Sequence, residues 1–428
     1  MRQSKDISRR AAIAGIGAAT ILSACGRSPG GAAIAGPSDP APARPASRMT
    51  SNSGFDGWVA SFKNRAEGQG YTRTFLDRVF QGAGYMPDVI AKDRKQTEFT
   101  RTLEDYLAIA ASDERVRNGR AKYNQYGSTL RSIEAKYGVE GKIVAAIWGM
   151  ESSYGARRGS EPIVSAMATL SYDGRRGAFF EKQLFAVLKI LQSGDTTPEN
   201  MRGSWAGAMG HTQFMPTSYL AYAVDFTGDG RRDIWSDDPT DALASAANYL
   251  KSFGWKTGQP WGVEVKIPAG FDRSRAGFSN TRNVSDWTAM GVRDMSGGTV
   301  GNYGASQVIE PAGGGGPAFM VFNNFNVIKR YNNATSYAIG VGHLGDRIAG
   351  GGPIRGNFGP DPQGLTLEDR KDIQQRLTSK GYDTDGADGV IGAKSEAAIR
   401  AFETANGMPS TGLATKALLV RLGGRPRG

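Results

Sequence analysis

One glutamate stands where acid–base chemistry is plausible. Glu151 ends the segment 141–151, GKIVAAIWGME, whose residues are apolar on nearly every side, so we expect a buried helix. On helical spacing Glu151 shares a face with Ile147 and Trp148, at the helix end where the macrodipole is negative. Both surroundings disfavour a carboxylate and should raise the pKa of Glu151, which suits a general acid. The pattern alone fits equally well a glutamate that emerges into solvent.

The elements around this helix are mainly helical. From residue 55 to about 250, apolar residues recur at intervals of three and four, which is typical of amphipathic helices. Residues 254–318 are rich in glycine and contain short strand-like pieces such as 263–267, which indicates a small β insertion. Helical spacing returns over 325–348. The sequence therefore predicts a mainly α fold with a small β insertion.

Two segments rich in Gly, Pro and Ala divide the chain. They cover 25–53 and 349–364, lack apolar periodicity, and predict flexible linkers. We expect a large domain at 54–348 and a small one at 365–422, which has two helical segments around the turn 385–389. A chain of 428 residues exceeds the usual size of one domain, which agrees with this division.

The first 25 residues predict export and a lipid anchor. Residues 1–10 are charged and end in Arg9-Arg10, and the uncharged stretch 11–24 is too short to span a bilayer, as in a signal peptide of residues 1–24. Leu22-Ser-Ala-Cys25 resembles a bacterial lipobox, in which the cysteine is acylated, and Cys25 is the only cysteine of the chain. Both the Sec and the twin-arginine routes stay open. By resemblance to enterobacterial lipoproteins, Gly26 favours the periplasmic face of the outer membrane in a Gram-negative bacterium.

Composition excludes some classes of protein. With 39% hydrophobic and 22% charged residues, the chain is an ordinary globular protein rather than a disordered one. Its net charge of +11 favours polyanionic partners. Because no basic run with interleaved aromatic residues is present, we expect no nucleic-acid partner.

Several recognisable motifs occur in order over roughly residues 54–348. The strongest are IWGMESSYG at 147–155 and SWAGAMGHTQFMPTSY at 204–219. The others, in chain order, are Phe55 with Trp58 and Phe62, Glu98-Phe99, Arg175-Arg176 with Phe179-Phe180, residues 225–235, Tyr331-Asn332, and Tyr337-Ala338. Such a series of motifs in order is more specific than any one of them, and it is similar to the membrane-bound lytic murein transglycosylase B family.

The resemblance implies a lysozyme-like catalytic domain that cleaves peptidoglycan between N-acetylmuramic acid and N-acetylglucosamine. Glu151 would protonate the glycosidic oxygen and then, as a carboxylate, take the proton of the sugar's own 6-hydroxyl, giving 1,6-anhydromuropeptides. No organic cofactor is implied. Matching positions would bind substrate through Ser204, Met209, Gln213, Tyr331, Asn332 and Tyr337, and would meet stem-peptide carboxylates through Arg175 and Arg176.

Two other functions stay open. A muramidase that uses water needs a second carboxylate about 5 to 10 Å from the first. No Asp or Glu falls in the motif positions that should line the cleft, which favours the single-acid mechanism. A lipoprotein that binds the wall without cutting it would share the tail and the anchor, but the presence of Glu151 with Ser204, Gln213 and Asn332 argues against it. The two histidines, His211 and His343, receive no catalytic role.

The loop 225–236, DFTGDGRRDIWS, resembles an EF-hand calcium loop. Asp225, Thr227 and Asp229 place oxygens at alternate positions before a glycine, which makes a structural calcium ion the candidate ligand. Ser236 stands where a closing glutamate is usual, so the closing acid must come from Asp237, Asp238 or Asp241. A turn capped by Asp and Gly is the alternative.

The tail at 365–422 resembles a three-helix peptidoglycan-binding domain. The resemblance rests on spacing, from Ile373-Gln374 and Leu377 through 388–392 and Phe402 to Leu418. Ser395 stands where threonine is usual, and Glu403 where glutamine is usual. The tail therefore predicts the fold more firmly than it predicts affinity for the wall.

Overall fold

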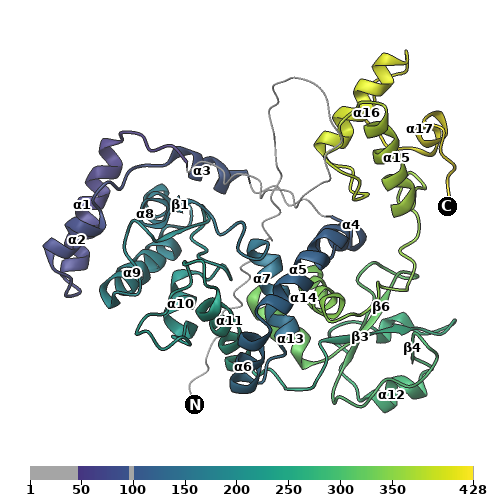
Figure 1. The fold of residues 1–428 in the computed structure, drawn as a ribbon, viewed down its shortest axis with the longest axis horizontal. Coiled ribbons are helices and arrows are strands. Elements are labelled where there is room, and N and C mark those ends of the chain that lie inside the picture. The colour runs from purple at the N-terminus through teal and green to yellow at the C-terminus, as the bar shows by residue number, and fades with distance from the viewer. Residues whose placement is uncertain (1–46, 96–100, 428) are drawn as a thin grey trace, which may run out of the picture. The chain divides into compact units, whose positions relative to one another are not determined.

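The protein is described here from a computed structural model that covers residues 47–95 and 101–427 (Figure 1). Within these residues the chain divides into two compact units, one of 47–95 and 147–252, the other of 101–146 and 253–427. The predicted signal peptide, Cys25 and most of the first linker lie outside the described residues, as do Glu98 and Phe99.

The first unit is helical, as predicted. α8 packs against α9, α9 against α10, and α1 and α3 against α8 (Figure 1). A two-residue ladder pairs β1 (Glu161–Pro162) with β2 (Arg202–Gly203) in antiparallel register. The helices are α1 (Ser53–Glu67), α2 (Arg73–Val79), α3 (Pro87–Arg94), the end of α7 (Gly141–Ser152), α8 (Ile163–Asp173), α9 (Gly177–Ser193), α10 (Pro216–Tyr222) and α11 (Thr240–Ser252).

Capping and apolar spacing explain where these helices form. At the start of α1, Asn52 Oδ1 accepts the backbone N–H of Phe55 (2.9 Å), which satisfies a donor that has no partner within the helix. Phe55 and Phe62 then bury their rings on one face, and Trp58 stacks on Phe62 with ring centroids 5.5 Å apart. α9 ends at Gly194, whose φ of 82° lies in the left-handed region that suits glycine.

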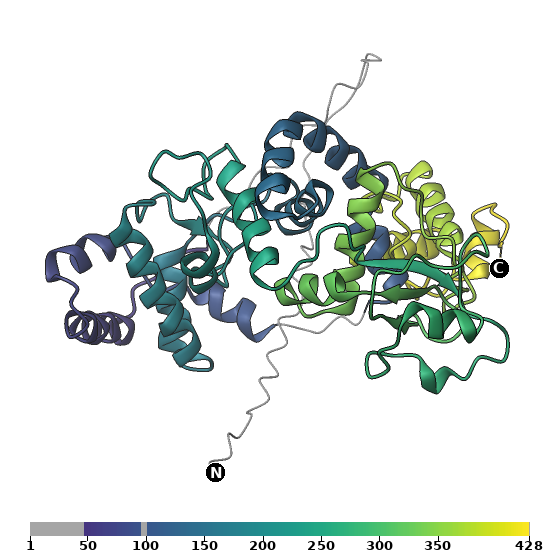
Figure 2. The same ribbon diagram turned by 90° about the horizontal axis from the view of Figure 1, so that it is seen from below.

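The second unit combines helices with the predicted β insertion. α14 packs against α4, α5 and α13. The sheet, whose strands are green arrows in Figure 2, is antiparallel with strand order β4-β3-β6-β5. It covers a core that includes Trp287 and Met320. Its elements are α4 (Leu103–Ala110), α5 (Asp113–Gln125), α6 (Gly127–Tyr137), β3 (Gly262–Lys266), η1 (Arg273–Arg275), α12 (Val284–Ala289), β4 (Arg293–Asp294), β5 (Gln307–Ile309), β6 (Ala318–Val321), α13 (Asn323–Tyr331) and α14 (Thr335–Ile348).

The tail folds as three helices, as predicted. They are α15 (Leu367–Ser379), α16 (Ala393–Ala405) and α17 (Lys416–Arg421), and they enclose an apolar core of their own. Thr366 and Asp369 form a capping box at the start of α15. The mainly α class with a small β insertion and a helical tail is therefore confirmed.

Residues 349–364 form turns and extended chain rather than helix or strand. Glu264 of β3 accepts the backbone N–H groups of Arg355 (3.0 Å) and Gly356 (2.6 Å). Asp361 accepts those of Gln363 and Leu365 just before the tail begins. These carboxylates hold the segment that the sequence marks as a linker.

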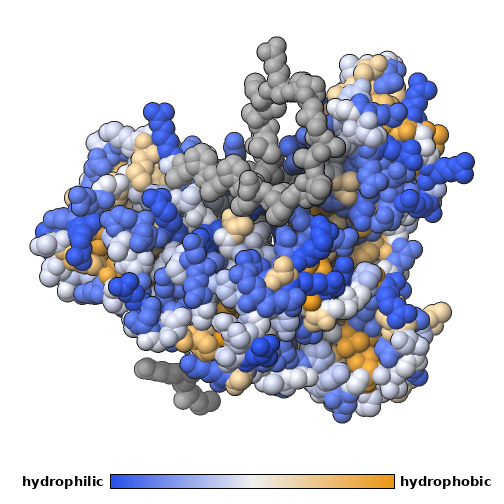
Figure 3. All heavy atoms as spheres, in the orientation of Figure 1, coloured by the Kyte–Doolittle hydropathy of each residue, from blue (hydrophilic) through white to orange (hydrophobic). Residues whose placement is uncertain are grey.

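Hydrophilic side chains predominate on the face shown in Figure 3, and apolar atoms form small separate patches there. In the described parts of the chain, no helix is both long and apolar enough to cross a membrane.

Candidate active site

Glu151 lies on the last turn of α7, as the sequence predicts. Residues 143–148 of this helix are buried, whereas Glu151 is partly exposed. Burial of the helix fixes the position of its end, where Glu151 keeps part of its surface in contact with solvent. The arrangement suits a single acid that both donates and accepts a proton.

The chain turns sharply after α7. Ser153 and Tyr154 have φ angles of 51° and 59°, in the left-handed region that residues other than glycine seldom adopt. Ser152 supports this turn because its Oγ accepts the backbone N–H of Gly155 (3.0 Å). Such backbone strain persists where the surrounding contacts determine it, and it clusters at functional sites.

The loop 204–214 carries three of the predicted substrate residues. Ser204 is partly exposed, and its Oγ accepts the backbone N–H of Ala208 (3.0 Å). Gln213, also partly exposed, has a φ of 54° and donates from Nε2 to the carbonyls of Gly210 (2.8 Å) and Arg158 (3.0 Å). These bonds fix the orientation of the Gln213 amide and place its nitrogen toward the protein.

Met209 differs from what a substrate-binding position requires. Its side chain is 0% exposed, and its backbone pairs with Phe214 through two hydrogen bonds of 2.9 and 3.0 Å. A side chain with no exposed surface cannot contact a sugar unless the loop moves. We therefore leave Met209 out of the proposed substrate surface, since its side chain packs inside the loop that carries Ser204 and Gln213.

The remaining predicted substrate residues belong to the second unit. Tyr331 ends α13 and is partly exposed, as is Asn332, whose Oδ1 accepts the backbone N–H of Ala334 (3.1 Å). Tyr337 on α14 is only 4% exposed, so little of its side chain is available to a substrate. The short segment 331–334 between α13 and α14 thus presents Tyr331 and Asn332 at the surface.

Arg175 and Arg176 share one buried acid. Asp93 Oδ2 accepts from Arg175 Nε (2.7 Å), and its Oδ1 accepts from Arg176 Nη2. Asp93 is buried, whereas Arg175 is exposed and Arg176 is partly exposed. Two guanidinium groups against one carboxylate leave a net positive charge at this surface.

The loop between α10 and α11 gathers acids. Oxygens of Asp225, Asp229 and Asp241 all lie within 4.8 Å of one another. Burial raises the pKa of Asp241, and the charge of Asp225 adds to this shift. Backbone N–H groups, that of Gly230 first, lower the pKa of Asp225. Of the three candidates for the closing acid, Asp241 is the one in this cluster.

His211, to which the sequence assigned no role, lies beside the end of α7. Its ring is 3% exposed, and Trp148 Nε1 donates to its Nδ1 (3.1 Å). Burial, the largest cause, lowers the pKa of His211. No sequence signal pointed to this contact, because the two residues are 63 positions apart.

Comparison with known families places this site in context. Residues 54–346 match the family model described as "Transglycosylase SLT domain". Residues 366–422 match the model described as "Putative peptidoglycan binding domain". The first match covers more than half of the chain and contains all the predicted catalytic and substrate residues.

Individual relatives are similar over much of their length. The chain is 37% identical over 236 residues to membrane-bound lytic murein transglycosylase B of Escherichia coli (strain K12), which is 55% of this chain and 64% of that protein. It therefore spans less than two thirds of that relative. Its structure matches SltB3 from Pseudomonas aeruginosa, solved in complex with NAG-anhNAM-pentapeptide, at 45% identity and a TM-score of 0.70, covering 86% of this chain and 99% of that one.

A further similar structure was solved with calcium. The Escherichia coli lytic transglycosylase Slt35 in complex with calcium matches at 31% identity and a TM-score of 0.59. The match covers 71% of this chain and 95% of that chain.

Proposed function

Because the chain belongs to the transglycosylase SLT domain family, we propose that it is a lytic murein transglycosylase of cell-wall turnover and remodelling. It cleaves the β-1,4 bond between N-acetylmuramic acid and N-acetylglucosamine without consuming water. The single observation that carries this proposal is the partly exposed residue Glu151 at the end of a buried helix. SltB3, which is 45% identical, was solved with a ligand that contains an anhydro sugar, and this supports the same product here.

In the proposed mechanism Glu151 acts twice. Its protonated form donates to the glycosidic oxygen as the bond to the anomeric carbon breaks, and the 2-acetamido carbonyl of the sugar stabilises the positive centre. The resulting carboxylate then accepts the proton of the 6-hydroxyl, whose oxygen closes on the anomeric carbon. The carboxyl group is protonated again at the end, so one residue completes the cycle.

Mass spectrometry of the soluble products from purified sacculi tests this proposal. Products ending in 1,6-anhydro-N-acetylmuramic acid are expected with the wild type and absent with Glu151→Gln. Glu181→Gln is the matched control, because Glu181 is a surface residue of the same unit paired with Arg65, and it should leave product release unchanged. Reducing ends one water heavier would instead make the protein a muramidase, and release by neither wild type nor control would favour a wall-binding protein.

Substrate contacts belong to the same proposal. Ser204, Gln213, Tyr331 and Asn332 are partly exposed, and we assign them to the glycan. We assign Arg175 and Arg176 to the carboxylates of the stem peptide, because the pair keeps a net positive charge beside Asp93. Arg176→Gln should then raise KM for peptide-bearing strands but not for strands without peptides, whereas Arg94→Gln, a surface arginine paired with Asp173, should change neither.

We propose that the tail, residues 365–422, binds the cell wall. We also propose that residues 349–364 link it to the catalytic domain. The support for wall binding is the match of residues 366–422 to a putative peptidoglycan binding domain. A chain that ends at residue 348 should sediment with sacculi less completely than the full chain, when both carry Glu151→Gln so that no substrate is consumed. Equal sedimentation of the two chains would contradict this assignment.

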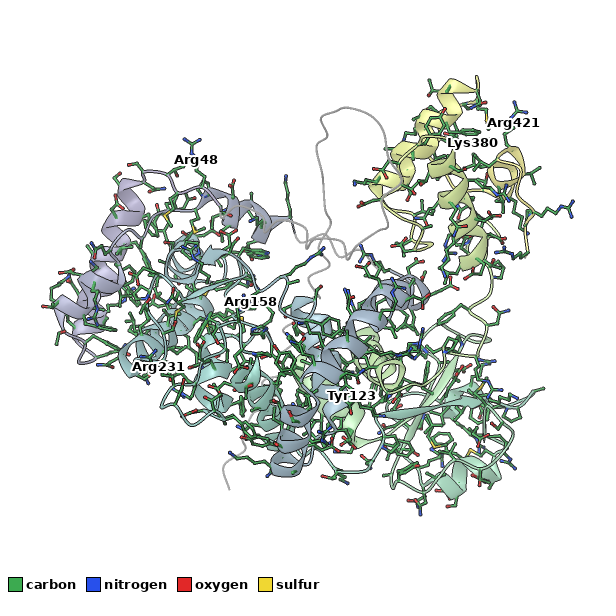
Figure 4. The ribbon with its side chains drawn as sticks, viewed as in Figure 1. Arg48, Tyr123, Arg158, Arg231, Lys380 and Arg421 are labelled. Carbon is green, nitrogen blue, oxygen red and sulfur yellow. The ribbon has the colours of Figure 1, made fainter. Side chains whose placement is uncertain are left out.

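A calcium ion fits the acidic loop. Three carboxylates of Asp225, Asp229 and Asp241 converge there, and oxygen ligands of this charge suit a hard cation. Thr227, the other predicted ligand, donates its hydroxyl hydrogen to Asp225 Oδ1 (3.2 Å), so it supports the first acid. Arg232 pairs with Asp195, which compensates one of the two positive charges of the loop. The exposed Arg231, labelled in Figure 4, keeps its charge on the loop.

Calorimetry tests this site. Calcium should raise the Tm of the wild type above that in a chelator, whereas magnesium should have a smaller effect, because it demands stricter geometry. Asp225→Asn should abolish the shift, and Asp272→Asn, which changes an exposed turn elsewhere, should leave it intact. A calcium-induced rise in Tm that persists in Asp225→Asn would show that the ion does not bind at this loop.

We also propose that the chain is a lipoprotein of the periplasmic face of the outer membrane. The support is the sequence Leu22-Ser-Ala-Cys25 behind an export signal. Mass spectrometry of the protein purified from a bacterial membrane should find a diacylated N-terminal Cys25. Cys25→Ser should move the protein to the soluble periplasmic fraction.

A further inference from the structure

His211 is buried between the end of α7 and the acidic loop. Its Nδ1 accepts from Trp148 Nε1 (3.1 Å), and its Nε2 lies 2.7 Å from the carbonyl oxygen of Ser236. An indole N–H can only donate, so Nδ1 must be the unprotonated nitrogen. The hydrogen of a neutral ring is then on Nε2, where the Ser236 carbonyl accepts it. Both ring nitrogens are therefore used in one tautomer.

The backbone of His211 also bonds to α7 on one side and to the acidic loop on the other. Its carbonyl accepts from Ser152 Oγ (2.6 Å), and its N–H donates to the carbonyl of Ile234 (3.1 Å). Trp148 and Ser152 lie three residues before and one residue after Glu151 on α7. Four hydrogen bonds of His211 thus connect the last turn of α7, on which Glu151 lies, with residues 234–236.

Close packing around the His211 ring adds to these hydrogen bonds. The rings of Trp148 and His211 meet edge to face with centroids 5.7 Å apart. A Cβ on residue 155 would lie 2.6 Å from His211 Nδ1, so the glycine at this position is what lets the ring approach. The space around the imidazole is closed, and a ring of another shape would displace the end of α7.

Charged groups complete the surroundings of His211. Arg158 donates from Nη1 to the carbonyls of Trp235 (2.8 Å) and Ser236 (2.6 Å), and its Nη2 pairs with Asp237. Its own carbonyl accepts from Gln213 Nε2. Figure 4 labels Arg158 within this unit. The same network therefore reaches both the turn that carries Glu151 and Gln213, a proposed substrate residue.

We propose that His211 is a positioning residue for Glu151, and that its neutral imidazole fixes the end of α7 against residues 234–236. The inference rests on the proposed function of Glu151. His211 acts through the end of α7, to which it is bonded through Trp148 and Ser152, so its loss should reduce the rate of the chemical step more than it weakens substrate binding. Misplacement of a reacting group by about 1 Å costs on the order of 100-fold in rate.

Kinetics on a soluble peptidoglycan oligosaccharide test this role. His211→Leu keeps a similar volume but removes the ring acceptor of the Trp148 N–H and one of the two donors to the Ser236 carbonyl, and it should lower kcat by roughly 10- to 100-fold with KM within about threefold. His211→Asn keeps an acceptor near the position of Nδ1 and should recover part of kcat. Ser245→Ala removes a buried hydrogen bond to Val224 in the same unit and should lower Tm without changing kcat.

A double-mutant cycle tests the same role in case the leucine variant folds poorly. Trp148→Phe removes the other half of the hydrogen bond, and it should lower kcat strongly in the wild type but only slightly in His211→Leu, which has no acceptor to lose. Additive effects, or equal kcat for the asparagine, leucine and wild-type chains, would overturn the proposal. Activity of Glu151→Gln equal to that of the wild type would overturn the proposed function instead, so the two failures are distinguishable.

Discussion

The ring of Tyr154 fills the space beside Gly149 in which a larger residue would place its Cβ. A Cβ built on residue 149 lies 2.5 Å from Tyr154 Cζ, a distance that real Cβ atoms essentially never show. Tyr154 is itself held in the left-handed region and packs edge to face on Trp148. The glycine in the motif IWGME thus allows the turn after Glu151 to fold back on its own helix.

Gly149→Ala should therefore lower both stability and activity. The methyl group forces the Tyr154 ring outward, at a cost of about 1–3 kcal/mol in the free energy of unfolding, typical of overpacking. The shift of the turn should reduce kcat by at least about tenfold. Thermal unfolding and product release measure the two effects.

Gly57→Ala is the matched control for this prediction. Residue 57 lies within α1, and a Cβ there meets nothing within 4 Å. Alanine should stabilise the helix by about 0.5–1 kcal/mol and leave the activity unchanged. A Gly149→Ala enzyme with the rate of the wild type would show that the position of the turn does not matter for catalysis.

Elements with strong local patterns could be predicted from the sequence. The continuous apolar run of 141–151 predicts α7 and the place of Glu151 at its end, and alternation near 263–267 predicts β3. These predictions are correct because the pattern of apolar residues that forms a buried helix or strand lies within one short, continuous segment.

Exposure and long-range partners could not be predicted in this way. A motif gives the type of residue at 209 or 337, but whether that side chain reaches the surface depends on packing by distant segments, and both are buried. The choice of Asp241 over Asp237 or Asp238 depends on where α11 begins. His211 acquires its importance from partners 63 and 25 positions away.

Asp93→Asn should destabilise the protein strongly. The buried carboxylate accepts from both Arg175 and Arg176, and an amide would turn one N–H donor toward a guanidinium donor. Because both guanidinium groups keep contact with water, the cost lies in the lost charge-assisted hydrogen bonds, and we expect a loss of about 1.5–3 kcal/mol in the free energy of unfolding. Calorimetry should show a clear fall in Tm. Asp77→Asn, in a surface pair with Lys63, should show almost none, and equal effects of the two variants would contradict this account.

His343 should make stability depend on pH. Burial, the largest cause, lowers its pKa from 6.5 to about 4, and Arg347 lowers it further while Asp346 opposes the shift. The unfolded chain therefore binds a proton near pH 6.5, whereas the folded chain stays neutral down to about pH 4. The free energy of unfolding should fall as the pH falls from 6.5 to 4, by about 2 kcal/mol at pH 5, and this contribution should be constant above pH 7.

Urea unfolding of His343→Gln at pH 7.5 and pH 5 isolates this contribution. Glutamine does not titrate, so the variant should lose less stability than the wild type between the two values. The paired carboxylates, such as Glu161 and Asp195, also lose stabilisation at low pH, but they contribute equally to both proteins. Identical losses in the two proteins would mean that His343 protonates in the folded chain as readily as in the unfolded one.

Glu403 should organise the turn before α17. Its carboxylate accepts the backbone N–H groups of Thr411 (2.6 Å) and Gly412 (2.9 Å) as well as the Thr411 hydroxyl (2.6 Å). These hydrogen bonds lower the pKa of Glu403 against the opposing effect of burial, which is the largest single cause. The stabilisation is therefore present above pH 4.5 and is lost as the pH falls below it.

Glu403→Gln should loosen this turn because the amide has one acceptor oxygen where the carboxylate has two. Hydrogen exchange of the full chain at pH 7 should show the amides of Thr411 and Gly412 exchanging about tenfold faster, which corresponds to the net contribution of one hydrogen bond. Glu396→Gln, in an exposed pair with Arg400 on the same helix, should leave both amides as protected as in the wild type. Unchanged exchange in Glu403→Gln would mean that glutamine holds the turn equally well, and that the carboxylate in this position is not needed for the fold of the tail.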